Sequence, residues 1–335
     1  MQVKDPRLAV NRLVNAYRQS QCLRVAVNLQ IAERLAEGSR TAAELAQQCG
    51  AHEPSLQRLL RALVAMEILI EDPPGRYVLT SLGEQLRADL LGPIAQLFNS
   101  PIYWEPWVNL EHSVKTGERA FDLVFGMRDW DYYAANPDVG AQFDAAMAAN
   151  TGPVSRAVVS AHDFSRSAVV ADIGGGDGTL LAEVLRRHPH IRGVLYDRPA
   201  VAERARARMV DQGLADRVNF VGGSFMESVP SGADTYVLKS IIHDWLDPDA
   251  ATILAHCRAA LEPGTDLLLV ERVVPEQAGP EGLEIFMMDL NMLVNTGGRE
   301  RTADEFRVLL TAAGFRLDRI VATAAGLSVL ESVAV

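Results

Sequence analysis

A glycine cluster between a strand pattern and a helix pattern is the feature of this sequence best suited to bind a small molecule. The apolar run 169–173 carries Asp172, four glycines follow within the next five residues, and helical periodicity begins at Leu180. Glycine allows a sharp backbone turn and lets a ligand approach the main chain closely. The unpaired N–H groups at the start of a helix add hydrogen-bond donors. The pattern therefore predicts a ligand site at a strand–turn–helix unit.

The spacing of the glycines separates two classes of ligand. A dinucleotide site needs G-x-G-x-x-G, whereas this turn has Gly174, Gly176 and Gly178, with Thr179 at the third glycine position of the dinucleotide motif. An acid followed by G-x-G-x-G is similar to the turn of S-adenosylmethionine (SAM) methyltransferases. Asp197 ends the next strand pattern, where its carboxylate can accept hydrogen bonds from both hydroxyls of a ribose.

Other polar residues follow the ends of predicted strands. Strand and helix patterns alternate from about residue 153, with strands expected at 168–173, 192–197, 217–222, 233–239, 265–272, 316–321 and 327–333. Alternation of this kind predicts a parallel sheet with helices on both faces, and ligands bind at the carboxyl ends of such strands. The polar residues expected at this edge are Asp172, Asp197, Ser224, Lys239, His243 and Glu271.

The first 95 residues are expected to form a separate domain. Helical periodicity covers 7–37, two more helical patterns begin near Thr41 and Pro54, and a hairpin is expected at 68–79. Short helices followed by a hairpin are typical of a winged helix. Residues 1–90 hold 11 Lys and Arg against 10 Asp and Glu, which is not the basic footprint of a DNA-binding domain. We therefore expect a role in dimerisation rather than in DNA binding.

Composition limits the remaining classes. The length of 335 residues suggests about two domains, and a net charge of −11 argues against a nucleic-acid partner, since phosphate contacts need clustered Lys and Arg. No apolar run reaches membrane-spanning length, and no signal-peptide core is seen, so a cytoplasmic location is expected. Cys22, Cys49 and Cys257 are far apart, so neither a disulfide framework nor a metal site is expected.

Four stretches of the chain resemble the small-molecule O-methyltransferases of the plant caffeate and bacterial antibiotic-tailoring type. They are Ser55–Leu63, Asp172–Gly178, Leu238–Trp245 and Gly297–Thr302, and the resemblance extends nearly from end to end. It implies an α/β fold with a Rossmann-like SAM methyltransferase domain over 153–335, whose sheet is mostly parallel with an antiparallel last strand. It also implies a winged-helix dimerisation domain over 1–95, a helical connector over 96–152 that contributes to the substrate pocket, and a homodimer formed through the N-terminal helices.

The resemblance also implies roles for single residues. His243 matches the general base, Glu271 and Glu300 match the carboxylates that orient it, Asp197 matches the ribose acid, and Lys239 matches a contact to SAM. The other cofactor-binding residues expected are Asp172, Gly174, Gly176, Arg198, Ser224 and Phe225. The substrate pocket is expected to include Trp130, Phe143, Met147, Asp244, Met287, Met288 and Asn291.

Taken singly, these residues have simpler interpretations. His243 could be a histidine at the start of a helix, hydrogen-bonded to Asp244 or Asp247. Asp244, Asp247 and Asp249 are expected to form an acidic cap on that helix. Glu300 alone is typical of a solvated charge between two arginines. The aromatic residues of 92–150 could be core packing rather than a pocket wall.

Two positions depart from the family's usual pattern. Ser224 stands where the family usually has an aspartate that accepts from the adenine amino group, so SAM binding is expected to be weaker or differently arranged. Arg198 stands where an apolar residue is common, and it is expected either to pack over the adenine or to face solvent.

The expected reaction is methyl transfer from SAM to a phenolic hydroxyl of a small aromatic secondary metabolite. The first alternative is a SAM-binding relative that performs hydroxylation, decarboxylation or pericyclic chemistry, a group that commonly loses the base. The net charge disfavours a DNA-binding regulator. Thr179, at the third glycine position of the dinucleotide motif, disfavours an NAD(P)-dependent oxidoreductase. N- or C-methylation stays open.

Overall fold

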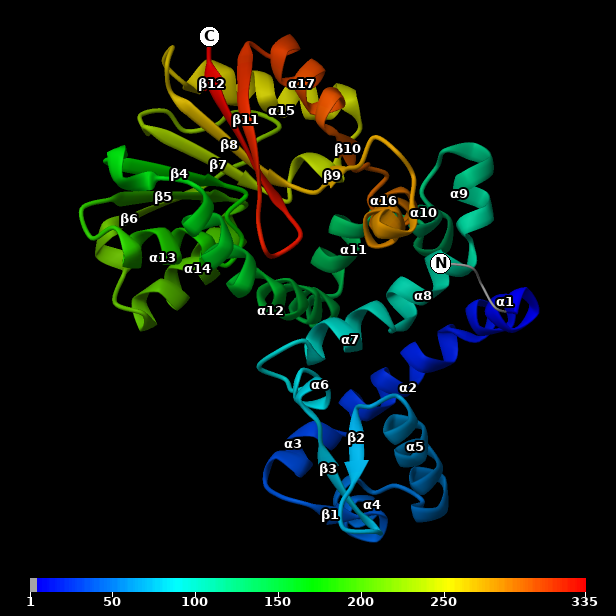
Figure 1. Ribbon diagram of the computed structural model, residues 1–335. Coiled ribbons are helices and arrows are strands. Elements are labelled where there is room, and N and C mark those ends of the chain that lie inside the picture. Colours follow the sequence, from blue (N-terminus) through cyan, green and yellow to red (C-terminus); the bar gives the residue numbers. More distant parts are fainter. Residues whose placement is uncertain (1–4) are drawn as a thin grey trace. The chain divides into compact units, whose positions relative to one another are not determined.

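The computed structural model describes residues 5–335 and divides the chain into two compact units (Figure 1). The first unit comprises the chain up to Glu105 together with Asn136–Asn150. The second comprises Pro106–Ala135 and Thr151–Val335. The segment 96–152, expected as a connector, is thus divided between the two units, and α8 (Pro101–Val108) and α12 (Pro137–Ala161) each contribute to both.

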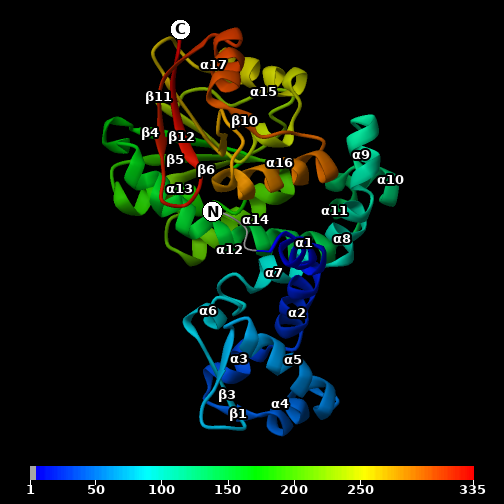
Figure 2. The same ribbon diagram turned by 45° about the vertical axis from the view of Figure 1, so that its right-hand side comes forward.

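The first unit is built from short helices and a small antiparallel sheet (Figure 2). Its strands are β1 (Arg40–Thr41), β2 (Leu69–Glu71) and β3 (Arg76–Leu79), in the order β1-β3-β2. Its other helices are α1 (Pro6–Asn15), α2 (Tyr17–Asn28), α3 (Ile31–Ala36), α4 (Ala42–Cys49), α5 (Glu53–Ala65), α6 (Ser81–Glu84) and α7 (Gly92–Phe98). The hairpin expected at 68–79 is confirmed, and β1 adds a third strand to it.

Local sequence explains where these helices begin and end. Thr41 forms a capping box with Glu44, whose backbone N–H donates to the Thr41 hydroxyl, and α4 starts there as expected. The helical stretch expected over 7–37 is interrupted, since Gln30 adopts a left-handed conformation with φ of 53° between α2 and α3. The core of this unit is aliphatic, with Leu45, Leu60 and Leu63 fully buried.

Helix α1 has an exposed apolar surface. None of its residues is buried, and Leu13 and Val14 keep 75% and 67% of their surface accessible. Leu8 and Val10 on the same helix are also exposed. Val10, Leu13 and Val14 share one face of the helix, and exposed apolar residues gathered on one face are typical of a surface that binds another surface.

The second unit contains a seven-stranded sheet in the order β11-β12-β8-β7-β4-β5-β6 (Figure 1). The strands are β4 (Val169–Ile173), β5 (Arg192–Asp197), β6 (Val218–Gly222), β7 (Thr235–Lys239), β8 (Asp266–Glu271), β11 (Phe315–Ala322) and β12 (Ser328–Ala334). Strand β12 runs antiparallel to both of its neighbours, and the other pairs are parallel. The expected mostly parallel sheet with an antiparallel last strand is therefore confirmed.

Helices cover both faces of this sheet. Alternate residues of a strand point to opposite faces, so Val170 packs with α13 (Thr179–Arg187) and α14 (Pro199–Asp211), whereas Ala171 packs with α15 (Asp247–Ala260) and α17 (Ala303–Ala312). The remaining elements are α9 (Leu110–Thr116), α10 (Ala120–Phe125), α11 (Asp129–Ala135), α16 (Leu283–Asn295), β9 (Val273–Val274), β10 (Arg301–Thr302) and the 3₁₀ turns η1 (Phe164–Arg166), η2 (Ala215–Arg217), η3 (Ile242–Asp244) and η4 (Pro280–Gly282). Within the described residues, no helix has the length and apolar character needed to cross a bilayer.

Candidate active site

The glycine turn between β4 and α13 requires glycine at three positions. Gly174, Gly176 and Gly178 have φ of 69°, 58° and 78°, in the left-handed region that side chains disfavour. A Cβ on Gly178 would lie 2.6 Å from the Met209 Cε atom, whereas a Cβ on Gly176 would meet nothing within 4 Å. The backbone at Gly176 therefore borders open space, as a ligand-binding turn needs.

Asp197 is tied to this turn from the end of β5. One of its carboxylate oxygens accepts from the Gly176 N–H at 2.9 Å and the other from the Arg198 N–H at 2.7 Å. Burial raises the pKa of Asp197, and these two donors oppose the rise. The expected ribose acid thus lies beside the glycine turn, with lone pairs left for further donors.

Asp172 lies beneath the turn and faces Lys239 of the neighbouring strand. A Cβ on Gly175 would lie 3.0 Å from the Asp172 Cγ atom, so this carboxyl packs against the turn. Burial raises the pKa of Asp172 to about 7, and the Lys239 charge opposes that rise. Burial lowers the pKa of Lys239 in turn. The Oδ2 atom of Asp172 has no hydrogen-bond partner among the described residues, so it can accept from a donor such as the amino group of SAM.

The residues expected near the adenine have local partners. The Ser224 hydroxyl accepts from the Met226 N–H at 3.3 Å, and the Phe225 ring meets Trp245 edge-on at 6.0 Å. The Arg198 guanidinium carbon lies 5.3 Å from the centroid of the Trp130 ring. Arg198 therefore covers an aromatic side chain expected in the substrate pocket, an arrangement that neither expectation for Arg198 included.

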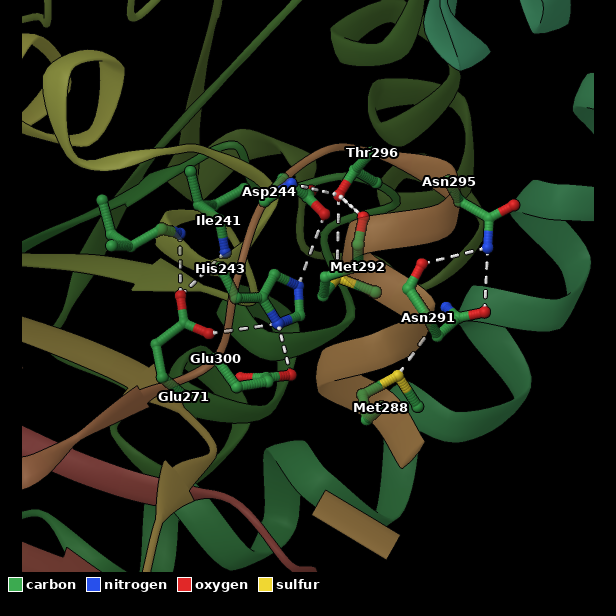
Figure 3. A network of polar contacts seen from close by, with 12 residues as sticks. Ile241, His243, Asp244, Glu271, Met288, Asn291, Met292, Asn295, Thr296 and Glu300 are labelled. Atoms are coloured by element: carbon green, nitrogen blue, oxygen red, sulfur yellow. Dashed lines mark hydrogen bonds and ion pairs between the residues drawn. The ribbon is translucent and has the colours of Figure 1, made fainter. Parts of the chain in front are cut away.

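His243 lies in η3, between two buried glutamates and an aspartate (Figure 3). Its Nδ1 atom is 3.1 Å from Glu300 Oε1 and 3.5 Å from Glu271 Oε2, and its Nε2 atom is 3.7 Å from Asp244 Oδ1. The imidazole is buried, since the His243 side chain keeps only 9% of its surface exposed. The two glutamates thus meet one ring nitrogen, and the other nitrogen faces the Asp244 carboxyl at the longer distance of 3.7 Å.

Glu271 and Glu300 are both fully enclosed. Glu271, at the end of β8, uses its Oε1 atom to accept from the backbone N–H groups of Ile241 and Ile242 at 3.0 and 2.8 Å. It therefore fixes the loop that carries His243 as well as facing the imidazole. Glu300 is 2% exposed, so its interpretation as a solvated charge is wrong. Glu300 is buried by packing between segments that are far apart in the sequence. The two arginines next to it in the sequence give no sign of this burial.

The charges around His243 change its proton affinity. Burial lowers the pKa of His243, but Glu271, Asp244 and Glu300 outweigh that effect and raise it to about 9. Burial raises the pKa of Asp244 to about 7, while the His243 charge opposes the rise. His243, Glu271 and Glu300 each offer one ligand atom, all within 4.8 Å of one another. These are donor types that metals accept, so the expectation that no metal binds remains a prediction.

A buried arginine that the sequence analysis did not single out supports the loop of His243. Arg301 is 1% exposed and donates to the carbonyls of Ile242 at 3.0 Å and Trp245 at 2.8 Å. It also donates to the Asp247 carboxylate at 2.7 and 3.1 Å. Arg301 lies in the segment Gly297–Thr302, which resembles the family, but nothing in the local sequence predicts that this arginine is buried.

Two residues just before Arg301, Gly298 and Arg299, lie against the backbone carbonyl of His243. The Arg299 N–H donates to the His243 carbonyl at 2.8 Å, and a Cβ on Gly298 would lie 2.0 Å from that same oxygen.

The interpretation of Asp244 as part of an acidic helix cap is wrong, because α15 begins at Asp247 and Asp244 belongs to η3 beside the imidazole.

The residues expected in the substrate pocket lie on several helices. Met287, Met288 and Asn291 belong to α16, and Met287 keeps 45% of its surface exposed. The Asn291 Oδ1 atom accepts from the Trp107 indole N–H at 3.1 Å. Figure 3 shows the Asn291 amide group beside the Met288 sulfur, to which it donates at 3.9 Å. Trp130 lies on α11 of the same unit, whereas Phe143 and Met147 lie on the part of α12 that belongs to the first unit.

Comparison with known proteins assigns both parts of the chain. A family model described as the O-methyltransferase domain matches residues 107–316, and one described as the O-methyltransferase dimerisation domain matches residues 11–89. The phenazine O-methyltransferase of Lysobacter antibioticus is 40% identical over 324 residues, which cover 96% of this chain and 94% of that protein.

Solved structures agree with this assignment. The structure of a mitomycin 7-O-methyltransferase matches with a TM-score of 0.90 and 36% identity, covering 98% of each chain. An O-methyltransferase of neocarzinostatin biosynthesis, solved with SAM and 2-hydroxy-5-methyl naphthoic acid, matches with a TM-score of 0.79 and 34% identity, covering 95% of this chain and 96% of that chain. The predicted family, fold class and cofactor are confirmed.

Proposed function

The chain belongs to the family of O-methyltransferases with a dimerisation domain, and its methyl donor is S-adenosylmethionine. On this basis we propose that the protein methylates a phenolic hydroxyl of a small aromatic secondary metabolite. We propose His243 as the general base of this reaction. The observation that carries the proposal is the buried His243, whose Nδ1 atom faces the enclosed carboxylates of Glu271 and Glu300, while its Nε2 atom lies on the other side of the ring, 3.7 Å from Asp244 Oδ1. One similar protein is named a phenazine O-methyltransferase, and another was solved with a naphthoic acid bound. Both compounds are aromatic, which supports an aromatic acceptor.

The need for a base follows from the acceptor. A phenol has a pKa near 10, so ionising it at pH 7 costs about 4 kcal/mol. A positioned base that takes the proton in the transition state accelerates such a step by about 10²–10⁴-fold. When bound, SAM would supply a methyl carbon on a sulfonium, and in-line attack by the acceptor oxygen on that carbon would release the neutral thioether S-adenosylhomocysteine.

The neighbours of His243 suit it to this role. Glu271 and Glu300 can accept the Nδ1–H, which fixes the tautomer and leaves Nε2 to take the phenolic proton, and they stabilise the imidazolium that forms. The same carboxylates hold the pKa of His243 above its ordinary value. A base must be unprotonated to take a proton, so the raised pKa makes the proposed reaction faster at alkaline pH.

The cofactor-binding residues form a second part of the proposal. We assign Asp197 to the ribose, Asp172 and Lys239 to the amino-acid end, and Gly174, Gly176, Arg198, Ser224 and Phe225 to the remaining contacts. The Asp172 Oδ2 atom without a partner and the open space at Gly176 support this assignment.

The assembly and the location belong to the proposal as well. The match to a dimerisation domain and the exposed apolar surface of α1 support a homodimer formed through the N-terminal helices. The net charge of −11 supports the absence of a nucleic-acid partner. The free thiols of Cys22, Cys49 and Cys257 support a reducing compartment such as the cytoplasm.

The test combines cofactor binding with turnover. We expect SAM and S-adenosylhomocysteine each to bind at about one per subunit in a calorimetric titration, and a panel of phenols to be methylated with labelled SAM, with or without EDTA. His243→Ala should lower turnover by about 10²–10⁴-fold with little change in SAM affinity. Full activity of that variant would overturn the base assignment, and SAM binding without any methyl transfer would favour a non-methylating relative. Loss of turnover in EDTA, restored by a divalent cation, would instead make His243, Glu271 and Glu300 a metal site.

A further inference from the structure

A buried carboxyl at the start of α11 has no role in the chemistry described so far. Asp129 is 3% exposed, and its Oδ1 atom has no hydrogen-bond partner among the described residues. Burial raises the pKa of Asp129 to about 6. A buried acceptor without a donor costs free energy of folding, and a ligand that supplies the donor removes that cost.

The neighbours of Asp129 place it in the same unit as the base. The Arg128 guanidinium carbon lies 5.4 Å from the centroid of the Trp245 ring, which follows Asp244 in the base loop. On the other side, Trp130 lies under Arg198, next to the ribose acid. The first turn of α11 thus reaches from the base loop to the cofactor-binding strand end.

Asp129 acts on Asp244, the carboxyl on the side of His243 that faces away from the glutamates. Its charge contributes to the raised pKa of Asp244, and the Asp244 Oδ1 atom lies 3.7 Å from His243 Nε2. Since Nε2 is the nitrogen left to take the acceptor's proton, Asp244 borders the acceptor side of the base, and Asp129 lies close enough to Asp244 for its charge to act on that carboxyl.

The nearby cations are engaged with other groups. Arg119 donates to the Asp122 carboxylate through Nε and Nη2, at 2.9 and 2.7 Å. Arg128 lies over the Trp245 ring. The charges of both arginines act to lower the pKa of Asp129, but no hydrogen bond within residues 5–335 reaches its Oδ1 atom, which remains available to a ligand.

We propose that Asp129 selects acceptors that carry a hydrogen-bond donor, an amino group or a second hydroxyl, on the ring position adjacent to the methylated hydroxyl. The inference rests on the proposed function and names its substrate class as ortho-aminophenols and catechols on an aromatic ring system. A site built to accept a hydrogen bond discriminates strongly against an analogue that lacks the donor, because the buried acceptor then stays unpaired.

The test uses two naphthols of similar size that differ in the donor. The complex of the protein with S-adenosylhomocysteine is titrated with 1-amino-2-naphthol and with 1-methyl-2-naphthol, in wild type, in Asp129→Leu and in Asp131→Leu. Asp131 is an exposed acid of the same helix, so its variant controls for the loss of one charge. We expect wild type and Asp131→Leu to bind the amino compound at least tenfold more tightly, and Asp129→Leu to lose that preference.

Thermal unfolding of the ligand-free proteins separates recognition from a structural role. Leucine is close to aspartate in shape and needs no hydrogen bond, so we expect Asp129→Leu to unfold at a higher temperature than wild type. A lower unfolding temperature would show that the carboxyl supports the fold. Asp129→Asn, which keeps an acceptor without the charge, should retain part of the preference.

Three results would each overturn the assignment: equal affinity of wild type for the two naphthols, binding of neither naphthol, or an unchanged preference in Asp129→Leu. Binding of S-adenosylhomocysteine in the same titrations keeps such a failure distinct from failure of the proposed function, which would show as no binding of SAM or S-adenosylhomocysteine at all.

Discussion

At the scale of single residues, the raised pKa of His243 predicts how activity depends on pH. The base works only when unprotonated, and Glu271, Asp244 and Glu300 raise its pKa to about 9 in the ligand-free protein. The logarithm of kcat/KM should therefore rise with pH through neutrality and level off only above about pH 9. Asp244→Asn removes the carboxylate nearest Nε2, so the inflection should move toward acid by about one unit. An inflection that stays in place in this variant would show that Asp244 does not act on the base.

Ser224 offers a second prediction at this scale. Its hydroxyl caps the following turn by accepting from the Met226 N–H, and an aspartate at this position can keep that cap and add a charged acceptor for the adenine amino group. Ser224→Asp should bind SAM as tightly as wild type or up to about tenfold more tightly, measured by calorimetry beside Ser224→Ala. A large loss of affinity would mean that the pocket is built around the smaller side chain.

At the scale of elements, Arg301 connects β10 to the loop between β7 and α15. Its guanidinium contacts the carbonyls of Ile242 and Trp245 and the Asp247 carboxylate, and a lysine ammonium cannot reach all three from a single nitrogen. Arg301→Lys should lower kcat by about tenfold or more, because a base displaced by a fraction of an ångström loses its alignment, while SAM affinity changes little. The matched control is Arg307→Lys, at an exposed ion pair on α17.

The readout that isolates positioning is kcat per folded molecule. Arg301→Lys should also unfold at a lower temperature, since it breaks a buried network, so activity is measured well below that temperature. A variant that is less stable but has the kcat of wild type would limit Arg301 to a structural role.

The elements themselves were largely predictable from sequence, because most of their signals are local. Each strand of the large sheet lies within two residues of its expected bounds, since apolar runs alternate with helical periodicity. The break at Gln30 was missed, because nothing in its neighbours requires a left-handed conformation there. The burial of Glu300, Arg301 and Asp129 was missed for a different reason. It results from packing between segments far apart in the chain, which periodicity does not report.

At the scale of the whole molecule, the exposed apolar side chains of α1 predict the oligomeric state. Leu13 keeps 75% of its surface exposed and Val14 keeps 67%, so a partner that covers them would gain about 25 cal/mol for each Å² buried. Light scattering after gel filtration should give a mass twice that of the 36.5 kDa chain. Leu13→Asp combined with Val14→Asp would place two charges in that interface and should shift the mass toward that of the single chain.

The control for this experiment comes from the other unit of the chain. Val308 on α17 is exposed to a similar extent, at 71%, but lies outside the match to the dimerisation domain, so Val308→Asp should leave the mass unchanged. A wild-type mass of one chain would exclude the homodimer, and an unchanged dimer in the double variant would move the interface away from α1. If the interface lies on α1, the double variant also shows whether methyl transfer requires the assembled dimer, because turnover per chain can be compared at equal SAM saturation.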